Sequence, residues 1–325
     1  MNLIATNILN GSIKKIVILF GAGVSVPSGI PDFRSKGGLY DTLRPELLTA
    51  TENQKILLQN NPTAVVDINL FQYNQFPYLE VRRPFILGTY ERKWKPTIAH
   101  YFCKILDEKN LLQRLYTQNI DGLDYHTGIN HSKVISVHGS IEKVECEFCK
   151  TVYDQKEFQV EVKKKIRNIY DITDLEAPVE STNIICKKCN KSGVKPATVL
   201  YGTNLPTEFF QSTKEDFPEQ VDLLIIAGSS LTVQPACSLV QHVKNDCPRI
   251  LVNRELVGTE LGIGNPSRND VVLLADADDG FIILASKLGW LSDLYLYRND
   301  MCEASRIKIT KAYEDSINNN TSSSL

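Results

Sequence analysis

Short runs of apolar residues recur along the chain, and each has the length of a buried β-strand. They are rich in Val, Ile and Leu and end in turn residues, a pattern typical of strands buried on both faces of a parallel sheet. The runs are Ile16 to Phe20, Leu112 to Thr117, Val134 to Val137, Leu223 to Ala227, Ile250 to Val252 and Val271 to Leu274.

Helical patterns fall between several of these runs. After Pro96, apolar residues recur at the three- and four-residue spacing of one helix face. They are Ile98, Tyr101, Phe102, Ile105 and Leu106. A second helix is expected to start after Pro235. Strands that alternate with helices predict an α/β fold with a doubly wound, Rossmann-like parallel sheet.

Two stretches interrupt this alternation, and we expect them to form a second, smaller lobe. Residues 40–95 are mixed in polarity and predict a helical insertion, whereas residues 139–202 contain paired cysteines and a charged middle. The sheet domain is then discontinuous and consists of residues 1–39, 96–138 and 203–300. Residues 314–325 are polar and low in complexity, which predicts a disordered tail.

Charge and hydropathy exclude some partners. The 36 Lys and Arg residues against 38 Asp and Glu residues give a net charge of −2, so no overall positive field attracts nucleic acid or anionic lipid. No apolar run approaches the ~18 residues of a membrane span, and the N-terminus lacks the pattern of a signal or transit peptide. We expect a cytoplasmic or nuclear protein with no direct nucleic-acid or membrane partner.

Small, polar and ionisable residues follow the expected strands. Examples are Gly21-Ala22-Gly23, Gln118-Asn119-Ile120-Asp121, His138-Gly139, Gly228-Ser229-Ser230 and Asn253-Arg254-Glu255. The carboxyl ends of strands are where open α/β sheets bind ligands. Ordinary strands also end in polar loops, but that explanation accounts poorly for so many Gly, Asn, Asp and His residues at one edge.

The first of these loops, residues 21–34, carries the strongest signal. Its glycines allow the backbone to approach a pyrophosphate, but Val26 replaces the third glycine of a GxGxxG motif, so a plain β-to-α turn is the alternative. The extension Pro31-Asp32-Phe33-Arg34 adds a stiff proline, opposite charges and an apolar ring. A purely structural role accounts poorly for the whole string.

Two further loops offer polar side chains for chemistry. Asn119 and Asp121 can hydrogen-bond ribose hydroxyls and an amide, although such residues also end strands as Asx turns. His138 follows an apolar strand on the expected ligand edge, and an unperturbed pKa near 6.5 suits a general base. The remaining histidines are interpreted as structural or solvated.

Two Cys-x₂-Cys pairs predict a metal site. Cys146, Cys149, Cys186 and Cys189 can supply four thiolates to one Zn²⁺ ion. The 36 residues between the pairs exceed the usual ~15–20, so a zinc ribbon with a long insertion is expected. A redox pair is the alternative, but it would leave the other pair unused. Four thiolates close the coordination shell, so the ion is structural.

The segment after the second pair returns to the sheet domain. Residues 195–206 form an extended, partly apolar stretch that either offers its edge to a bound peptide or is an ordinary linker strand. The sequence pattern alone does not favour one over the other.

Taken together and in order, these motifs resemble the sirtuin family of NAD-dependent protein lysine deacylases. The matching segments are GAGVSVPSGIPDFR at 21–34, TQNID at 117–121, His138-Gly139, the cysteine pairs, residues 196–206, GSSLTVQP at 228–235, Asn253 and Gly289-Trp290. The resemblance runs from about residue 13 to 290 and is closest to the class that includes cytoplasmic and nuclear deacetylases.

The resemblance implies transfer of an acyl group from lysine to ADP-ribose with release of nicotinamide. It implies NAD as co-substrate, one structural zinc ion, and acetylated histone or non-histone proteins as partners. Catalysis is assigned to His138, as the base, and Asn119. Peptide binding is assigned to Val199, Leu200, Tyr201 and Gly202. NAD binding is assigned to Gly21, Ala22, Gly23, Ser25, Val26, Asp32, Phe33, Arg34, Gln118, Asn119, Ile120, Asp121, Gly228, Ser229, Ser230, Asn253, Arg254, Glu255 and Ala277.

The chain departs from the family pattern at a few positions. Tyr201-Gly202-Thr203 replaces Phe-Gly-Glu, Ser229 replaces a Thr, and Ala277 replaces a common Cys. The sirtuin class that removes acidic acyl groups carries a Tyr and an Arg in the early loop, and Tyr40 and Arg44 do not match that frame. Protein ADP-ribosyl transfer and a non-catalytic NAD-sensing or zinc-ribbon scaffold are the alternative functions.

Overall fold

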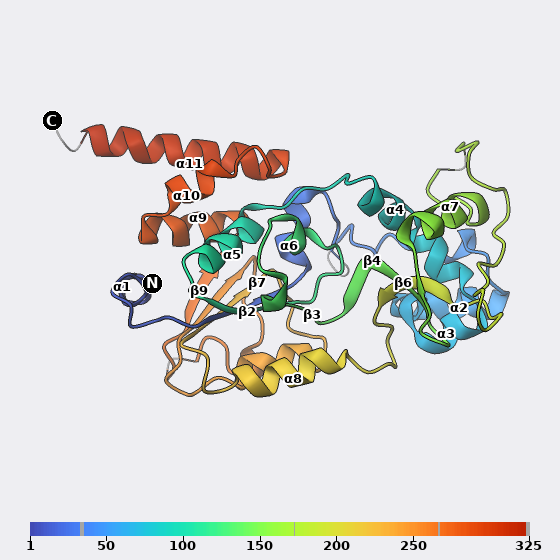
Figure 1. The fold of residues 1–325 in the computed structure, drawn as a ribbon, viewed down its shortest axis with the longest axis horizontal. Helices are drawn as coiled ribbons and strands as arrows, with labels where there is room; N and C mark the ends of the chain where they lie inside the picture. Colours follow the sequence, from blue (N-terminus) through green and yellow to red (C-terminus); the bar gives the residue numbers. More distant parts are fainter. Residues whose placement is uncertain (33–35, 172, 266, 323–325) are drawn as a thin grey trace.

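The computed structural model describes residues 1–32, 36–171, 173–265 and 267–322. Figure 1 shows a large lobe built around a parallel sheet and a small lobe that contains the helices α2 (Glu52–Asn60), α3 (Ile68–Tyr73), α4 (Phe76–Tyr90) and α7 (Gln155–Lys165). Strand β4 (Gly139–Cys146) lies where the two lobes meet. Both chain termini lie on the large lobe, at the N-terminal helix α1 (Asn2–Leu9) and the C-terminal helix α11 (Glu303–Ser322).

Within the described residues, the large lobe contains a six-stranded sheet in the order β3-β2-β1-β7-β8-β9, and its neighbouring strands pair in parallel. Its strands are β1 (Ile16–Phe20), β2 (Leu112–Thr117), β3 (Val134–Ser136), β7 (Leu223–Ala227), β8 (Arg249–Asn253) and β9 (Val271–Leu274). The strand order reverses at β1, which pairs with both β2 and β7. Such a reversal creates a crevice for ligands at the carboxyl ends. The predicted Rossmann-like α/β fold is therefore confirmed.

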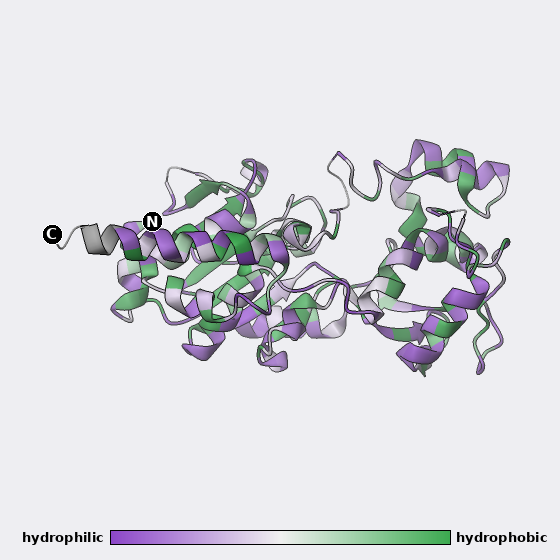
Figure 2. Ribbon diagram, turned by 90° about the horizontal axis from the view of Figure 1, so that it is seen from above, coloured by the Kyte–Doolittle hydropathy of each residue, from purple (hydrophilic) through white to green (hydrophobic). Residues whose placement is uncertain are grey.

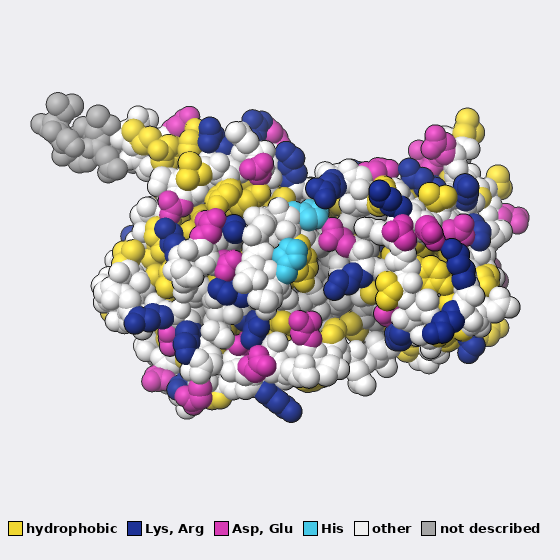
Figure 3. Space-filling view, in the orientation of Figure 1, with side chains coloured by type: hydrophobic (Ala, Val, Ile, Leu, Met, Phe, Trp, Pro, Cys, Tyr) yellow, Lys and Arg dark blue, Asp and Glu magenta, His cyan; other side chains and the backbone are white. Residues whose placement is uncertain are grey.

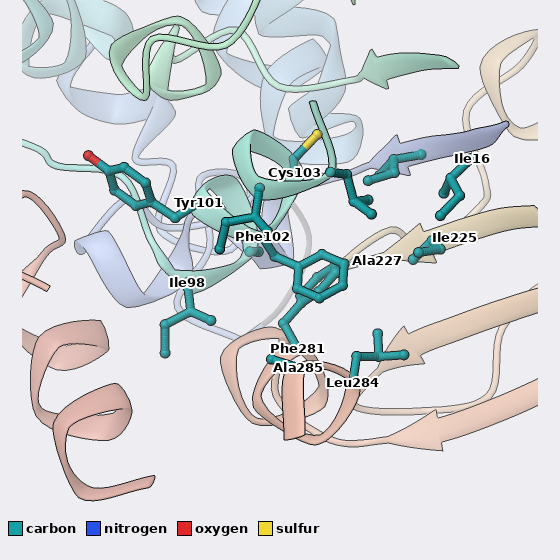
Figure 4. Close-up of a cluster of buried hydrophobic side chains, with 14 of the residues drawn as sticks. Ile16, Ile98, Tyr101, Phe102, Cys103, Ile225, Ala227, Phe281, Leu284 and Ala285 are labelled. Atoms are coloured by element: carbon teal, nitrogen blue, oxygen red, sulfur yellow. The ribbon is translucent and has the colours of Figure 1, made fainter. Parts of the chain in front are cut away.

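Helices cover both faces of this sheet, with α5 (Ile98–Glu108), α9 (Ala277–Leu288) and α10 (Leu291–Leu296) on one face and α8 (Thr207–Asp216) on the other. Figure 4 shows α5 and α9 packing their apolar side chains over β1 and β7. Phe102 and Phe281 lie at the centre of this cluster, with ring centroids 4.9 Å apart. The helical stripe after Pro96 therefore faces the core, as its spacing predicts.

Two sequence expectations differ from the structure outside the site. The segment after Pro235 forms the 3₁₀ helix η6 (Ala236–Gln241) and not a regular α-helix, because its turns close with three-residue bonds such as Ser238 N to Pro235 O. The expected disordered tail is helical as far as Ser322. The buried Ile309 anchors α11 on the core and the helix continues through the polar residues, whereas residues 323–325 lie outside the described residues.

The small lobe combines the two insertions around one apolar core. Its helical part contains η3 (Pro45–Leu47), α2 (Glu52–Asn60), η4 (Pro62–Val66), α3 (Ile68–Tyr73) and α4 (Phe76–Tyr90). Its cysteine-containing part contains β4 (Gly139–Cys146), β5 (Val152–Tyr153), α7 (Gln155–Lys165) and β6 (Val194–Thr198), with the antiparallel strand order β5-β4-β6. Because one core is shared, neither insertion buries its apolar face alone.

The long insertion between the cysteine pairs packs against α4. Arg83 on α4 donates from Nε to the Ile166 carbonyl at 2.9 Å and pairs with Asp174 at 3.3 Å. The fully buried carboxylate of Glu80 accepts hydrogen bonds from Thr49 and from the Ser181 hydroxyl. The insertion therefore supports the outer face of α4, whose inner face lines the cavity described below.

Surface charge is mixed. Figure 3 shows acidic and basic side chains interspersed on the visible face of both lobes. Figure 2 shows hydrophobic strands inside the large lobe and both hydrophobic and hydrophilic residues along α11. None of the helices in the described part of the chain is long and apolar enough to cross a membrane.

Candidate active site and metal centre

A cavity of about 410 Å³ opens at the carboxyl ends of the central strands, between the two lobes. It brings together most of the residues predicted for NAD and peptide binding. These are Gly21, Ala22, Gly23, Val26, Asp32, Gln118, Asn119, Ile120, His138, Val199, Leu200, Tyr201, Gly202, Gly228, Ser229, Ser230, Asn253, Arg254, Glu255 and Ala277. Ser25 and Asp121 are buried behind the wall. Phe33 and Arg34 lie outside the described residues.

The glycine loop after β1 folds into the short 3₁₀ turns η1 (Ala22–Val24) and η2 (Val26–Ser28). It interlocks with the loop after β7, because Gly23 N donates to the Gly228 carbonyl at 2.8 Å. A Cβ on Gly21 would lie 2.6 Å from the Gly228 oxygen, and Gly228 itself has a φ of +61°. Only glycines allow the two loops to approach this closely, which leaves backbone at the cavity wall.

A buried hydrogen-bond network fixes the loop after β2. The Ser25 hydroxyl donates to Asp121 Oδ2 at 2.7 Å and accepts from Asn119 Nδ2 at 3.1 Å. Burial raises the pKa of Asp121, while hydrogen bonds from the Leu123 backbone and the Ser25 hydroxyl oppose that shift. The amide of Asn119 is thereby held at the cavity floor by groups that are themselves buried.

Two titratable groups below this floor are also buried. Asp124 lies on α6 (Leu123–His126), and burial, with a smaller effect of Asp121, raises its pKa to about 8. Burial and the charge of His126 lower the pKa of His100 to about 3. His100 Nε2 lies 3.9 Å from Asp124 Oδ1. At neutral pH both are mainly uncharged, so they add little charge beneath the cavity.

His138 lies between the end of β3 and the start of β4 and is half-buried at the cavity wall. Its Nδ1 lies 2.9 Å from the Gln118 carbonyl oxygen. A carbonyl only accepts, so Nδ1 carries the proton and Nε2 is the nitrogen that can take one. This arrangement leaves Nε2 as the ring nitrogen that can accept a proton, which is what a general base at this position requires.

The opposite end of the cavity lies over β8 and β9. Asn253 ends β8, and its carbonyl accepts a hydrogen bond from Ala275 N at 2.9 Å. Gln118 Nε2 donates to Ser229 Oγ at 3.1 Å and so ties the loops after β2 and β7 together. Polar residues therefore line the cavity along the strand ends from Gln118 to Asn253.

The segment after β6 forms the small-lobe side of the cavity. Val199 N donates to the His138 carbonyl at 2.9 Å, and Tyr201 exchanges backbone hydrogen bonds with Val66 and Ile68. Tyr201 also forms a parallel bridge with Asp67. Residues Val199 to Tyr201 are thus held beside His138, and the chain then turns at Gly202, which has a φ of +89° and lies in a turn where Thr203 N donates to the Leu200 carbonyl at 3.1 Å.

The small-lobe helices contribute cavity residues that sequence reasoning missed. Tyr40, Val66, Tyr78 and Arg82 line the cavity, and the Tyr78 hydroxyl lies 2.7 Å from Thr198 Oγ1. Tyr78 and Arg82 are four residues apart on α4 and therefore share one face. That spacing was a visible signal, but nothing in the sequence indicates which face of the helix meets the cavity. Thr203, Asn204, Leu205, Phe210, Val233, Gln234 and Pro235 also line it.

The four paired cysteines meet at one point of the small lobe, with their sulfur atoms all within 4.8 Å of one another. The Cys146–Cys189 and Cys149–Cys186 sulfur distances are 3.7 and 3.6 Å. Zinc–sulfur bonds of about 2.3 Å in a tetrahedron place sulfurs about 3.8 Å apart, so the cluster fits one zinc ion. Burial raises the pKa of the Cys146 thiol to about 12, so a cation bound at the cluster would favour its thiolate form.

Neighbouring groups suit four thiolates. The Tyr153 hydroxyl donates to Cys186 Sγ at 3.0 Å, and Thr151 Oγ1 lies 3.2 Å from Cys149 Sγ. Donors of this kind orient ligands and stabilise their negative charge. Four thiolate ligands would complete a tetrahedral zinc site and leave no open position for a catalytic water. The other cysteines, Cys103, Cys237, Cys247 and Cys302, are buried.

Comparison with known proteins agrees with this geometry. A sequence profile of the Sir2 family matches residues 21–235. The chain is 38% identical to NAD-dependent protein deacetylase sirtuin-2 of Danio rerio, over 90% of this chain and 72% of that protein. It is 36% identical to NAD-dependent protein deacetylase sirtuin-3 of Mus musculus, over 86% of this chain and 74% of the relative. It is 32% identical to NAD-dependent protein deacetylase hst2 of Schizosaccharomyces pombe, over 90% and 77% of the two chains. The sirtuin resemblance is confirmed, and the chain belongs to the Sir2 family.

Proposed function

We propose that this protein is an NAD-dependent protein lysine deacetylase, which transfers the acyl group of a modified lysine to ADP-ribose and releases nicotinamide. The relatives named above are all described as NAD-dependent protein deacetylases. None of the described features favours ADP-ribosyl transfer to protein or a non-catalytic scaffold over this reaction.

The cavity wall supports NAD binding along the strand ends. Ala22, Gly23, Ser229 and Ser230 would hold the pyrophosphate with backbone N–H groups and hydroxyls. Asn253, Arg254, Glu255 and Ala277 would hold the adenosine half, while Asn119, Ile120 and Asp121 would hold the nicotinamide half. NAD supplies the sugar carbon that accepts the acyl oxygen once nicotinamide has left.

The orientation of His138 carries the proposal. Its Nδ1–H is fixed on the Gln118 carbonyl at 2.9 Å, so its Nε2 is the acceptor for a proton from a ribose hydroxyl. The protein segment that we propose binds the peptide is hydrogen-bonded to the backbone of His138, because Val199 N donates to the His138 carbonyl. One residue therefore joins the expected peptide edge to the proton acceptor in a single cavity.

The position of Val199 to Gly202, at the small-lobe side of the cavity and next to His138, supports binding of an acylated polypeptide. A substrate polypeptide would lie along this segment and direct the acyl-lysine between the lobes. The partners proposed are acetylated proteins, whether histones or others, and the proposed location is the cytoplasm or nucleus. The zinc ion has a structural role, because its four thiolate ligands hold the ribbon beside this segment.

Nicotinamide release tests the proposal. Purified protein is given NAD with and without an acetyl-lysine peptide, and the His138→Ala variant is compared. Release that requires the peptide and is lost in the variant is the expected result. Release without peptide would favour ADP-ribosyl transfer or NAD hydrolysis. No release from folded, zinc-containing protein would leave the scaffold function.

A further inference from the structure

Lys195 is fully buried in β6. This strand directly precedes residues Val199 to Gly202, the segment proposed to bind the peptide, which we call the peptide edge. The Lys195 side chain is 0% exposed, and its ammonium lies 3.0 Å from Glu147 Oε2, 3.1 Å from the Pro196 carbonyl and 2.7 Å from the Thr198 carbonyl. A lysine ammonium has three N–H donors, and these contacts use all of them. Burying such a charge is costly unless it is fully paired, so the site is built around this cation.

The contact between Lys195 and the Thr198 carbonyl lies close to His138, the proposed catalytic base. Thr198 pairs with Gly139 in the β4–β6 ladder, and the next residue, Val199, donates its N–H to the His138 carbonyl at 2.9 Å. The approach is so close that a Cβ on Gly139 would lie 2.1 Å from the Ala197 oxygen. The position of the Thr198 peptide unit therefore affects both the backbone of His138 and the start of the peptide edge.

The contact between Lys195 and the Glu147 carboxylate lies close to the cysteine cluster. Glu147 follows Cys146 directly, and its backbone N donates to the Gly193 carbonyl at 2.7 Å, inside the loop that carries the second cysteine pair. The zinc ligands hold this loop in place. The Glu147 carboxylate is thus fixed by the cysteine cluster and not by the large lobe.

We infer that Lys195 is a positioning residue that connects the cysteine cluster to the peptide edge and His138, by clamping the Thr198 carbonyl against the Glu147 carboxylate. This inference rests on the proposed function for its kinetic consequence but not for its structural one. It explains how a zinc ion without an open coordination site can still control substrate binding.

A positioning role and a general packing role for Lys195 lead to different results when its charge is removed. An apolar side chain fills the same volume, but it cannot hold two carbonyl oxygens and one carboxylate together. Strand β6 would keep its ladder to β4, whereas the Thr198 carbonyl would lose its hydrogen bond from the Lys195 ammonium and hence its link to Glu147. We therefore expect peptide affinity to fall while the NAD half of the cavity, built on β1, β7 and β8, is unchanged.

The experiment compares Lys195→Met, Glu147→Gln and the control Lys150→Asn. Lys150 pairs with the same carboxylate at 2.9 Å but is exposed and does not reach β6. Its φ of +54° is one that Asn tolerates. KM values for an acetyl-lysine peptide and for NAD are measured, together with zinc content. Hydrogen exchange is followed by mass spectrometry over residues 195–203, with α7 as the internal reference.

We expect Lys195→Met to raise the peptide KM about tenfold or more, the equivalent of one lost charge-assisted hydrogen bond, with the NAD KM within about twofold. Exchange over 195–203 should accelerate while α7 is unchanged. Glu147→Gln should show a smaller effect in the same direction, and Lys150→Asn should match the wild type. If Lys195→Met does not fold, the milder Glu147→Gln variant decides.

Unchanged peptide KM and unchanged exchange in folded, zinc-containing Lys195→Met or Glu147→Gln protein would overturn the inference. Equal changes in both KM values, or faster exchange throughout the small lobe, would indicate general destabilisation and would also overturn it. If the wild type has no deacylase activity, the proposed function fails, and the exchange data alone decide on the clamp.

Discussion

The Ser25 hydroxyl provides a sensitive test of how the cavity floor is built. It is buried, donates to Asp121 Oδ2 at 2.7 Å and accepts from Asn119 Nδ2 at 3.1 Å. The Ser25→Ala substitution removes both bonds and leaves a buried amide donor and a buried carboxylate with one partner fewer. Since the change deletes a single oxygen atom, its effect comes from the lost hydrogen bonds and not from altered side-chain packing.

The magnitude follows from the two bonds. A neutral hydrogen bond contributes about 1 kcal/mol and a bond to a charged group about 1.5–3 kcal/mol, so we expect a loss of about 3 kcal/mol in the free energy of unfolding. The pKa of Asp121 should rise further, because the Ser25 hydroxyl is one of the groups that lower it. Loosening of Asn119 and Asp121 should weaken NAD binding by about tenfold or more.

Urea unfolding and calorimetric titration with NAD measure these two effects. Ser28→Ala is the matched control, because Ser28 lies on the same loop and its hydroxyl donates to the Lys95 carbonyl at 2.6 Å at an exposed position. That bond should contribute only about 0.5–1.5 kcal/mol. A Ser25→Ala protein as stable as the Ser28→Ala protein, with unchanged NAD affinity, would refute the reasoning.

Three other predictions follow from charge and metal binding. Removing zinc with a chelator should lower the melting temperature and abolish peptide-dependent activity, and full activity after verified zinc loss would contradict a structural ion. Burial raises the pKa of Asp278 from 3.8 to about 6, so folding stability should fall by about 3 kcal/mol as pH rises through that window. The Asp278→Asn variant should lack this fall when unfolding by urea is compared at pH 4 and pH 7.5, and an equal fall in both proteins would assign it to other groups. Arg82→Met should lower kcat/KM for a carboxylate-bearing acyl peptide relative to an acetyl peptide about tenfold, because Arg82 is a cation at the cavity wall. An unchanged ratio would show that Arg82 does not reach the acyl group.

Much of the large lobe was predictable because its strands are continuous apolar runs. The bounds of β1, β2, β7 and β9 agree with the sequence expectation to the residue. Burial on both faces leaves no polar position inside such strands, so polar residues mark their ends clearly. Most of the residues proposed to bind NAD were found by the same rule, since they lie at or just after the ends of the strands.

The small-lobe half was less predictable for a physical reason. Tyr78 and Arg82 lie on a helix with a weak amphipathic pattern, whose buried residues include Glu80, Arg82 and Arg83. Buried charges of this kind are recognised only when their partners from distant segments are known. Lys195 has the same property, because its partner Glu147 lies 48 residues earlier in the sequence. Local patterns do not encode such pairs.

The C-terminal helix shows the limit of composition as a guide. Residues 314–322 are polar and low in complexity, yet they prolong a helix that Ile309 anchors on the core. Helix propagation costs little once a segment is nucleated by packing. Composition predicts what a segment forms alone, not what it forms as the extension of a docked helix.

The fate of the acyl group tests the central claim most directly. A peptide whose lysine carries an isotopically labelled acetyl group is incubated with the protein and NAD, and the products are separated at early times. Acyl transfer predicts one labelled acetyl group on ADP-ribose for each lysine and each nicotinamide released, and no such product with His138→Ala. Labelled free acetate formed while NAD stays intact would contradict the account and indicate hydrolysis by another route.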